Sequence, residues 1–146
     1  MEYTKTIFYK DIPLDKILLE IELQKYVSTN YNFCPKIIKV NYYNDRIDII
    51  MEKIIGVCIF EKYGDNPLDI PIFIWNQIHK IISSLFYNDG IEYIDISSYN
   101  FILANDKIYI IDFGHAYWCH PNKQIQNWFL CQFIEDELNT FNPDFI

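Results

Sequence analysis

The stretch EYIDISSYNFILANDKIYIIDFG, residues 92–114, constrains the fold of this 146-residue chain more than any other segment. Its two short apolar runs, FIL and IYII, flank the dipeptide ND at 105–106, a pattern that predicts a tight β-hairpin. Asp95 and Asn100 precede the hairpin, and Asp112 follows it directly. Because a hairpin brings the outer ends of its strands together, we expect these three side chains to meet at one edge of the fold.

Two carboxylates and one amide oxygen form a set of hard oxygen ligands. Mg²⁺ prefers such ligands, and it takes few of them from the protein and the rest from water and phosphate. A further carboxylate beside a metal-bound phosphate orients an attacking hydroxyl group. Gly114 allows a sharp turn of the chain after Asp112. The same residue types also favour turns and helix caps, so turn chemistry is the alternative interpretation.

The rest of the chain predicts a single mixed α+β domain. Pro13 suits the first turn of a helix, and Gly90 is well placed to end one. Apolar spacing, β-branched and aromatic runs and turn residues predict strands over 3–9, 36–43, 46–54, 100–104 and 107–112, and helices over 14–27, 72–90 and 122–139.

Asp95…Asn100, followed after an apolar hairpin by Asp112-Phe113-Gly114, resembles the catalytic core of the protein-kinase-like superfamily. The resemblance implies a kinase-like fold that binds ATP and Mg²⁺. In it, Asp95 orients the acceptor as the catalytic carboxylate, and Asn100 and Asp112 hold the metal. Asp112 also belongs to the nucleotide site.

The resemblance extends upstream of the hairpin. The segment IIMEKI is similar to the hinge strand that meets the adenine, which places Met51 near the gatekeeper position and Glu52, Lys53 and Ile54 in the hinge. Lys5 is then the lysine that contacts the α- and β-phosphates, and Glu20 is the helix acid that holds it.

Two alternatives remain open for this pair. Lys10 is a second choice for the lysine, although it lies closer to the following helix, and Glu22 is a second choice for the acid. A solvated pair of charges without a common function is the plain alternative for Lys5 and Glu20.

Three departures mark a reduced, atypical member. Tyr93-Ile94-Asp95 stands where the family has His-Arg-Asp, and Ser97 replaces the usual lysine, as in RIO-type kinases and, with a hydroxyl residue there, the kinase-like ATPase subunit of the KEOPS complex. No Gly-rich phosphate loop is present, and only about thirty residues follow Gly114. We therefore expect a truncated small N-lobe over 1–53 and a minimal helical C-lobe over 54–146.

The expected function is that of a minimal atypical kinase-like protein that acts as a serine/threonine-type phosphotransferase or an ATPase. The alternative is a nucleotide-binding pseudokinase or scaffold that works with a partner. A third class, small-molecule phosphotransferases of the aminoglycoside or choline kinase type, carries large acceptor pockets that are not evident in this sequence.

The composition limits the classes of partner that this chain is expected to bind. A net charge of −8 and a pI of about 4.7 argue against direct binding of nucleic acid, which needs a basic surface. The N-terminal residues lack the apolar core of a signal peptide, and no apolar run approaches membrane-spanning length.

We therefore expect a soluble intracellular protein without membrane partners. ATP or GTP is its expected ligand, and a protein partner or a homodimer is a candidate cover for the missing lid. Abundant Ile, Asn, Tyr and Lys suggest an AT-rich genome, such as that of a large virus. His115, Cys119 and His120 resemble half of a zinc site, but no second half is visible.

Overall fold

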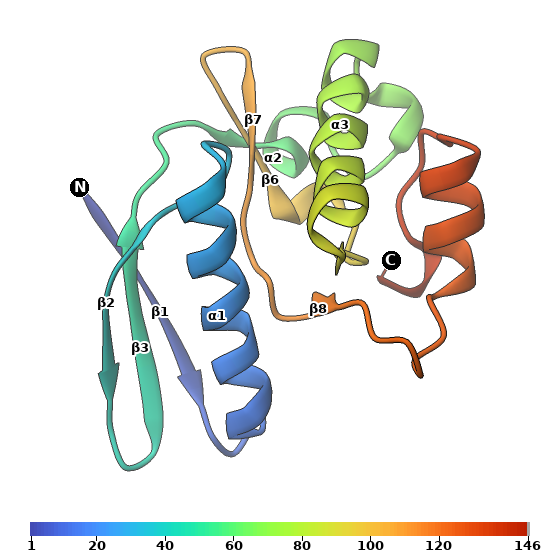
Figure 1. Ribbon diagram of the computed structural model, residues 1–146. Helices are drawn as coiled ribbons and strands as arrows, with labels where there is room; N and C mark the ends of the chain where they lie inside the picture. The colour runs from blue at the N-terminus through green and yellow to red at the C-terminus, as the bar shows by residue number, and fades with distance from the viewer. Residues whose placement is uncertain (146) are drawn as a thin grey trace.

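The computed structural model describes residues 1–145, which form a mixed α+β fold of two packed parts. Ile146, the last residue of the predicted domain, lies outside the described residues. The smaller part, on the left of Figure 1, holds three strands and one long helix. Its elements are β1 (Glu2–Phe8), α1 (Leu14–Asn30), β2 (Ile37–Tyr42) and β3 (Arg46–Glu52).

The larger part contains most of the helices and the second sheet. Its elements are β4 (Val57–Cys58), α2 (Ile59–Tyr63), η1 (Pro67–Asp69), α3 (Ile72–Asp89), β5 (Ile91–Glu92), η2 (Ser98–Asn100), β6 (Phe101–Ala104), β7 (Lys107–Ile110), β8 (Tyr117–Trp118), the π-helix η3 (Trp128–Glu135) and η4 (Pro143–Phe145). Within residues 1–145, none of the helices is both long and apolar enough to cross a bilayer.

The first sheet is antiparallel, with β3 in the middle and β1 at one edge. A hairpin at residues 44–45, between the strands predicted over 36–43 and 46–54, joins β2 to β3, and the Tyr43 N–H donates to the Arg46 carbonyl there at 2.9 Å. Alternation of side chains along the strands gives this sheet one apolar face. That face forms a small core with two side chains of α1; the core residues are Ile7, Ile17, Ile21, Ile47, Ile49 and Met51.

Helix α1 belongs to two cores, because apolar residues occupy more than one of its faces. Ile17 and Ile21 pack on the first sheet. Leu23 and Val27 instead enter the larger core, which also contains most of the buried side chains of α3. The two parts are therefore joined by a shared helix as well as by the chain that leads out of β3.

The predicted hairpin and the predicted long helix of the larger part are confirmed. Strands β6 and β7 pair antiparallel around Asn105 and Asp106, whose φ values of 50° and 63° suit a tight turn. Helix α3 ends at Gly90, whose φ of 65° is the left-handed conformation that glycine adopts without strain.

Three features differ from the sequence prediction. The last helix covers Trp128–Glu135 and not 122–139. Just before it, the side chain of Gln126 bonds to Asn142 and Asp144 at 2.7 and 2.8 Å, and just after it Glu137 has a left-handed φ of 52°, a conformation typical of a helix end. The short elements β4 and α2 follow the first sheet, where no periodic pattern predicts them. The two-residue strands β5 and β8 pair across the chain and are also too short to carry a sequence signal.

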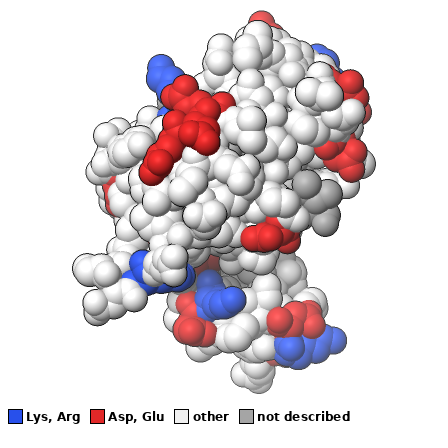
Figure 2. Space-filling view, turned by 90° about the vertical axis from the view of Figure 1, so that its right-hand side faces the viewer, with Lys and Arg blue, Asp and Glu red and all other residues white. Residues whose placement is uncertain are grey.

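The charged side chains are unevenly distributed over the surface. On the face shown in Figure 2, acidic groups gather in the upper half, whereas basic and acidic groups alternate in the lower half. Basic side chains form no continuous patch on that face, in keeping with the net charge of −8.

Gly56 is required by packing. A Cβ at this position would lie 2.4 Å from the Leu103 carbonyl oxygen of β6, so the linker between the two parts can lie against β6 only with glycine there. We expect Gly56→Ala to lower the free energy of unfolding by about 1–3 kcal/mol, measured by urea denaturation. Ile55→Ala is the matched control, since the Ile55 side chain is 64% exposed. Equal urea midpoints for the two variants would contradict this packing argument.

Candidate functional site

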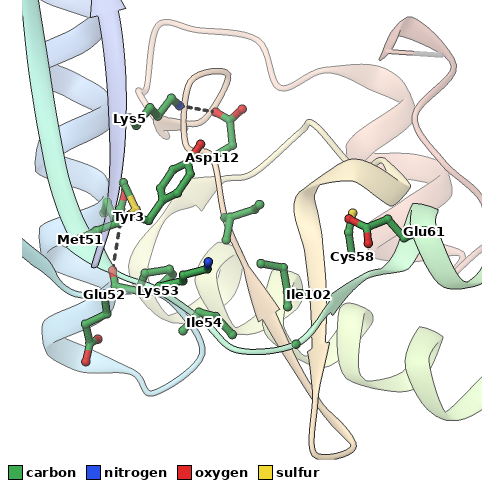
Figure 3. Close-up of a pocket in the computed structure, with 14 residues that line it drawn as sticks. Tyr3, Lys5, Met51, Glu52, Lys53, Ile54, Cys58, Glu61, Ile102 and Asp112 are labelled. Atoms are coloured by element: carbon green, nitrogen blue, oxygen red, sulfur yellow. Dashed lines mark hydrogen bonds and ion pairs between the residues drawn. The ribbon is translucent and has the colours of Figure 1, made fainter. Parts of the chain in front are cut away.

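A pocket of about 350 Å³ lies between the two parts of the fold. Figure 3 shows Lys5 and Asp112 on one side of it and Cys58 and Glu61 on another. The six residues that the sequence assigns to nucleotide binding all line this pocket; they are Lys5, Met51, Glu52, Lys53, Ile54 and Asp112. The remaining assigned residues, Glu20, Asp95 and Asn100, lie outside the lining.

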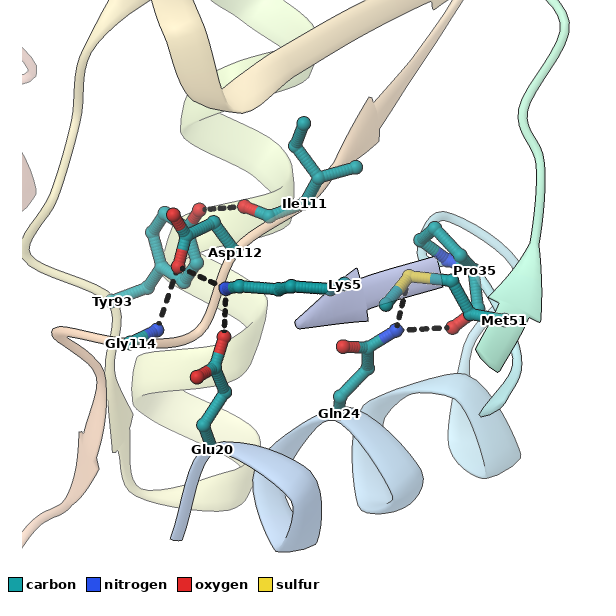
Figure 4. A network of polar contacts seen from close by, with 9 residues as sticks. All are labelled: Lys5, Glu20, Gln24, Pro35, Met51, Tyr93, Ile111, Asp112 and Gly114. Atoms are coloured by element: carbon teal, nitrogen blue, oxygen red, sulfur yellow. Dashed lines mark hydrogen bonds and ion pairs between the residues drawn. The ribbon is translucent and has the colours of Figure 1, made fainter. Parts of the chain in front are cut away.

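Three charged side chains from distant segments meet at one end of the pocket (Figure 4). The Lys5 ammonium group forms an ion pair with Glu20 Oε1 and a second ion pair, at 3.2 Å, with Asp112 Oδ1. Lys5 comes from β1, Glu20 from α1 and Asp112 from the segment after β7. One lysine therefore connects the first sheet, the long helix and the end of the hairpin.

The strand and helix periods explain this meeting, and the two alternatives, Lys10 and Glu22, lie away from it. Lys5 and Ile7 alternate along β1 and share the face turned to α1, and Glu20 is buried on α1 with 3% of its surface exposed. Glu22 is exposed two positions further along the helix. Lys10 is exposed beyond the end of β1, with its ammonium group 5.7 Å from the centre of the Phe8 ring.

Asp112 adopts an unusual backbone conformation. Its φ is 65°, in the left-handed region that aspartate tolerates better than most residues. The Gly114 N–H donates to Asp112 Oδ1 at 2.9 Å, and the intervening Phe113 is buried with its ring centre 5.4 Å from that of Tyr93. The turn is thus held by an apolar anchor on one side and aims the carboxylate at Lys5 on the other.

The loop that carries Asp95 and Asn100 is fixed to the same strand end. The Tyr93 hydroxyl donates to the Ile111 carbonyl, and the Ile111 N–H donates to the Asn100 carbonyl at 3.0 Å. The Asn100 side-chain amide donates to the Asp95 carbonyl at 3.0 Å. The loop and the Asp112 turn therefore lie together, as the hairpin argument predicts.

Several lining residues are not among those assigned from the sequence. Tyr3 lies two positions from Lys5 on the same strand face, and Gln24 lies one helical turn after Glu20. The two-residue strand period and the 3.6-residue helix period could therefore have predicted that both residues lie beside the assigned ones. The Gln24 amide donates to the Pro35 carbonyl at 3.0 Å and to Met51 Sδ at 3.4 Å. Cys58 and Glu61 depend on β4 and α2, which the sequence does not predict.

The charged groups at this end of the pocket shift one another's pKa values. Burial alone would lower the pKa of Lys5, but Glu20 and Asp112 outweigh it and raise that pKa above its ordinary value. Burial alone would raise the pKa of Asp112, but Lys5 and the Gly114 N–H lower it below its ordinary value. Burial raises the pKa of Asp95, against the Asn100 hydrogen bond. Asp112 is thus held ionised, whereas Asp95 is made more basic.

The residues that could hold Mg²⁺ keep suitable atoms free. Among residues 1–145, Asp112 Oδ2 and Asn100 Oδ1 have no hydrogen-bond partner, while their neighbouring atoms are held by Gly114 and Asp95. Two protein oxygens fit a Mg²⁺ ion that takes its other ligands from phosphate and water. In the described part of the chain, no group of three His, Cys, Asp or Glu side chains is arranged to hold a metal. His115, Cys119 and His120 therefore form no such group.

No protein-family model matches the chain, and no curated protein sequence matches it. What the site does therefore has to follow from its own residues.

Removal of the lysine should show how far the site depends on it. We expect Lys5→Met to cost about 2–3 kcal/mol of unfolding free energy, because it leaves the carboxylate of Glu20 buried and unpaired. This is less than for a fully buried pair, since the Lys5 side chain is 27% exposed. The double variant Lys5→Met/Glu20→Gln should recover at least half of this loss in urea denaturation. A double variant as unstable as the single one would show that the buried charge is not the cause.

The lowered pKa of Asp112 gives a pH dependence of defined sign. A carboxyl group whose pKa falls below its ordinary value of 3.8 on folding adds stability above that value, and this stability is lost as the pH falls through the folded pKa. Urea midpoints should therefore show a larger advantage of the wild type over Asp112→Asn near pH 6 than at about pH 2.5. Asn also tolerates the left-handed backbone, so the substitution tests charge.

Asp65→Asn is the control for this measurement. Asp65 is exposed and forms no ion pair within residues 1–145. A gap between the wild type and Asp112→Asn that stays constant over the same pH range would contradict the assignment.

Proposed function

We propose that the protein binds ATP or GTP together with Mg²⁺ in this pocket and transfers or hydrolyses the terminal phosphoryl group. The observation that carries the proposal is the ammonium group of Lys5, which is held by Glu20 and faces Asp112 at the end of a largely apolar pocket. A nucleotide has a flat apolar base at one end and a charged phosphate tail at the other, and the pocket has the same polarity.

The apolar region of the pocket suits a purine base. Met51, Ile54, Ile102 and Ile111 contribute apolar side chains to the lining. The Glu52 and Lys53 N–H groups donate to the Lys36 and Met1 carbonyls, whereas the Ile54 N–H has no backbone acceptor within residues 1–145. That free donor lies beside the pocket and is available to an acceptor nitrogen of a base.

The charged end suits the phosphates. Lys5 would contact two neighbouring phosphate groups, and Asp112 and Asn100 would hold Mg²⁺. The ion would supply charge neutralisation of the phosphate oxygens and orientation of the tail. Glu20 keeps Lys5 extended toward the pocket, and the Gly114 N–H keeps the Asp112 carboxylate from rotating away.

Asp95 would orient the group that accepts the phosphoryl. Its raised pKa makes it a better proton acceptor than an exposed aspartate, and it stands on the loop that Asn100 and Tyr93 fix beside Asp112. A hydroxyl group of a protein or a water molecule would fit this role, which corresponds to serine/threonine-type phosphotransfer or ATP hydrolysis. Positioning and electrostatic stabilisation would supply most of the acceleration.

The order of the elements supports the finer proposal of a reduced kinase-like fold. A strand with Lys5, a helix with Glu20, a strand that ends at Met51 and Glu52, a long helix and a hairpin before Asp112 follow one another as the resemblance implies. Within this proposal, the protein is similar to RIO-type kinases and to the kinase-like subunit of KEOPS. It would act inside the cell, where nucleotide and Mg²⁺ are present.

One observation favours a second candidate, a nucleotide-binding scaffold without turnover. The side chains of Lys5 and Asp112 are 27% and 41% exposed, so the phosphate end is open to water. An open site leaves the tail less well positioned, and positioning governs phosphoryl transfer. Such a protein would bind the nucleotide without accelerating the reaction.

Titration calorimetry with ATP, in the presence and absence of Mg²⁺, tests binding, and phosphate release tests turnover. We expect Asp112→Ala to lower Mg²⁺-dependent turnover by roughly 100-fold or more, and Asp95→Asn to do so with less than about threefold change in nucleotide affinity. Asp65→Ala should match the wild type. Binding without turnover would favour the scaffold, and no binding at millimolar Mg²⁺-ATP would overturn the proposal.

A further inference from the structure

Strand β1 leaves one edge of the first sheet unpaired. The sheet order is β1-β3-β2, and β1 pairs only with β3. The Met1 carbonyl accepts from the Lys53 N–H, and the Tyr9 N–H donates to the Asp45 carbonyl, each at 3.1 Å. Because hydrogen-bonded and non-hydrogen-bonded positions alternate in an antiparallel pair, the odd-numbered residues of β1 bond to β3.

The even-numbered residues of β1 therefore direct their backbone N–H and C=O groups outward. These are Glu2, Thr4, Thr6 and Phe8, and all four are exposed. Within the described chain, only the Phe8 carbonyl has another partner, the turn at Asp11 and Ile12. A row of free donors and acceptors of this kind is a template for a further strand.

This edge borders the open end of the pocket. Tyr3 and Lys5 belong to β1, and both line the pocket. Among residues 1–145, no element covers the outer side of β1, and the phosphate-facing side chains of Lys5 and Asp112 stay partly exposed. A strand added at the edge would extend the sheet beside the charged end of the pocket.

We propose that this strand is β1 of a second copy, paired antiparallel about a two-fold axis at Thr6, so that two three-stranded sheets join into one. Thr6 then exchanges both backbone hydrogen bonds with Thr6 of the other copy, and Thr4 lies opposite Phe8. The N–H of each Phe8 donates to the carbonyl of Thr4 on the other copy.

Charge selects this register. Glu2 lies opposite Glu52 in its own sheet, an unfavourable pairing of like charges, and it has no cation partner in the described chain. With the axis at Thr6, Glu2 of each copy lies at the end of the other copy's β1, where Lys10 follows in the turn 9–11. With the axis at Lys5, the two Lys5 residues would face each other. The first register therefore brings opposite charges together at both ends of the joint and places no like charges opposite each other.

The side-chain faces agree with this arrangement. The joined strands keep both α1 helices on the same side of the sheet, because pairing of outward-directed positions preserves the pleat. Tyr9 of one copy comes opposite Tyr3 of the other, at the mouth of the pocket. Since β1 runs away from the larger part of the fold (Figure 1), antiparallel pairing places the two larger parts at opposite ends of the joined sheet.

The pairing of the edges does not require a nucleotide, whereas its role as a cover for the phosphate tail rests on the proposed function. The first measurement is therefore made without nucleotide. Sedimentation equilibrium of the intact protein at about 200 µM, in roughly 0.15 M salt so that the charge of −8 on each copy is screened, should show a dimer.

Thr6→Pro removes an outward-directed N–H, and proline is tolerated in edge strands at such positions. We expect it to weaken the dimer by at least about tenfold, whereas Thr6→Ala, which loses only the hydroxyl bond to Asp48, should change it by less than about threefold. Circular dichroism and urea midpoints show whether both variants remain folded.

Charge exchange tests the register. Glu2→Lys and Lys10→Glu should each weaken the dimer by roughly tenfold, because each places like charges opposite one another, and the double variant should return to within about threefold of the wild type. A dimer whose dissociation constant is unchanged by both Thr6→Pro and the charge exchange overturns the proposal. So does a monomeric protein, which would leave the edge to a strand of a different protein.

The nucleotide measurement separates the two proposals. If the dimer forms as described and Mg²⁺-ATP does not bind, the edge pairing stands and the proposed function fails. If Mg²⁺-ATP binds the wild type and Thr6→Pro with equal affinity and turnover, the covering role fails. We expect Thr6→Pro to weaken nucleotide affinity in proportion to the loss of dimer.

Discussion

The arrangement of the pocket depends on one ammonium group that satisfies two carboxylates. Lys5 lies between Glu20, which is almost fully buried, and Asp112, which reaches water on one side. A buried carboxylate is tolerable only with a partner, so the helix, the first sheet and the turn after β7 are held in one relative position by this contact. The ammonium group still lines the pocket, and the proposal of a phosphate ligand rests on it.

A second constraint is the conformation of the Asp112 turn. The left-handed backbone, the buried Phe113 and the hydrogen bond from Gly114 act together, so the direction of the carboxylate does not depend on its own rotamer preference. The loop with Asp95 and Asn100 is tied to the neighbouring Ile111 by both of that residue's backbone groups. Side chains that are separated by up to seventeen positions in the sequence therefore form one rigid edge.

The sequence predicts those parts of the fold whose signals are long or periodic. Helix α3, the two hairpins and the edge strand β1 follow from apolar spacing and turn residues, and Lys5 and Glu20 meet because strand and helix periods turn them to the same side. The short elements β4, α2, β5 and β8 contain two to five residues and have no period to detect. The last helix is shorter than predicted, and no local pattern reveals the tertiary hydrogen bonds that Gln126 forms beside its start. Cys58 and Glu61 reach the pocket only through those undetected elements.

Helix α1 contributes to both hydrophobic cores, and this has a consequence for the motion of the protein. A hinge between the two parts would have to pull Leu23 and Val27 out of one core or Ile17 and Ile21 out of the other. We therefore expect the two parts to move as one body, with a pocket that is already formed before any ligand arrives. Binding of a ligand then costs little free energy for ordering the protein. Its release does not wait for the two parts to open, so we expect a high dissociation rate.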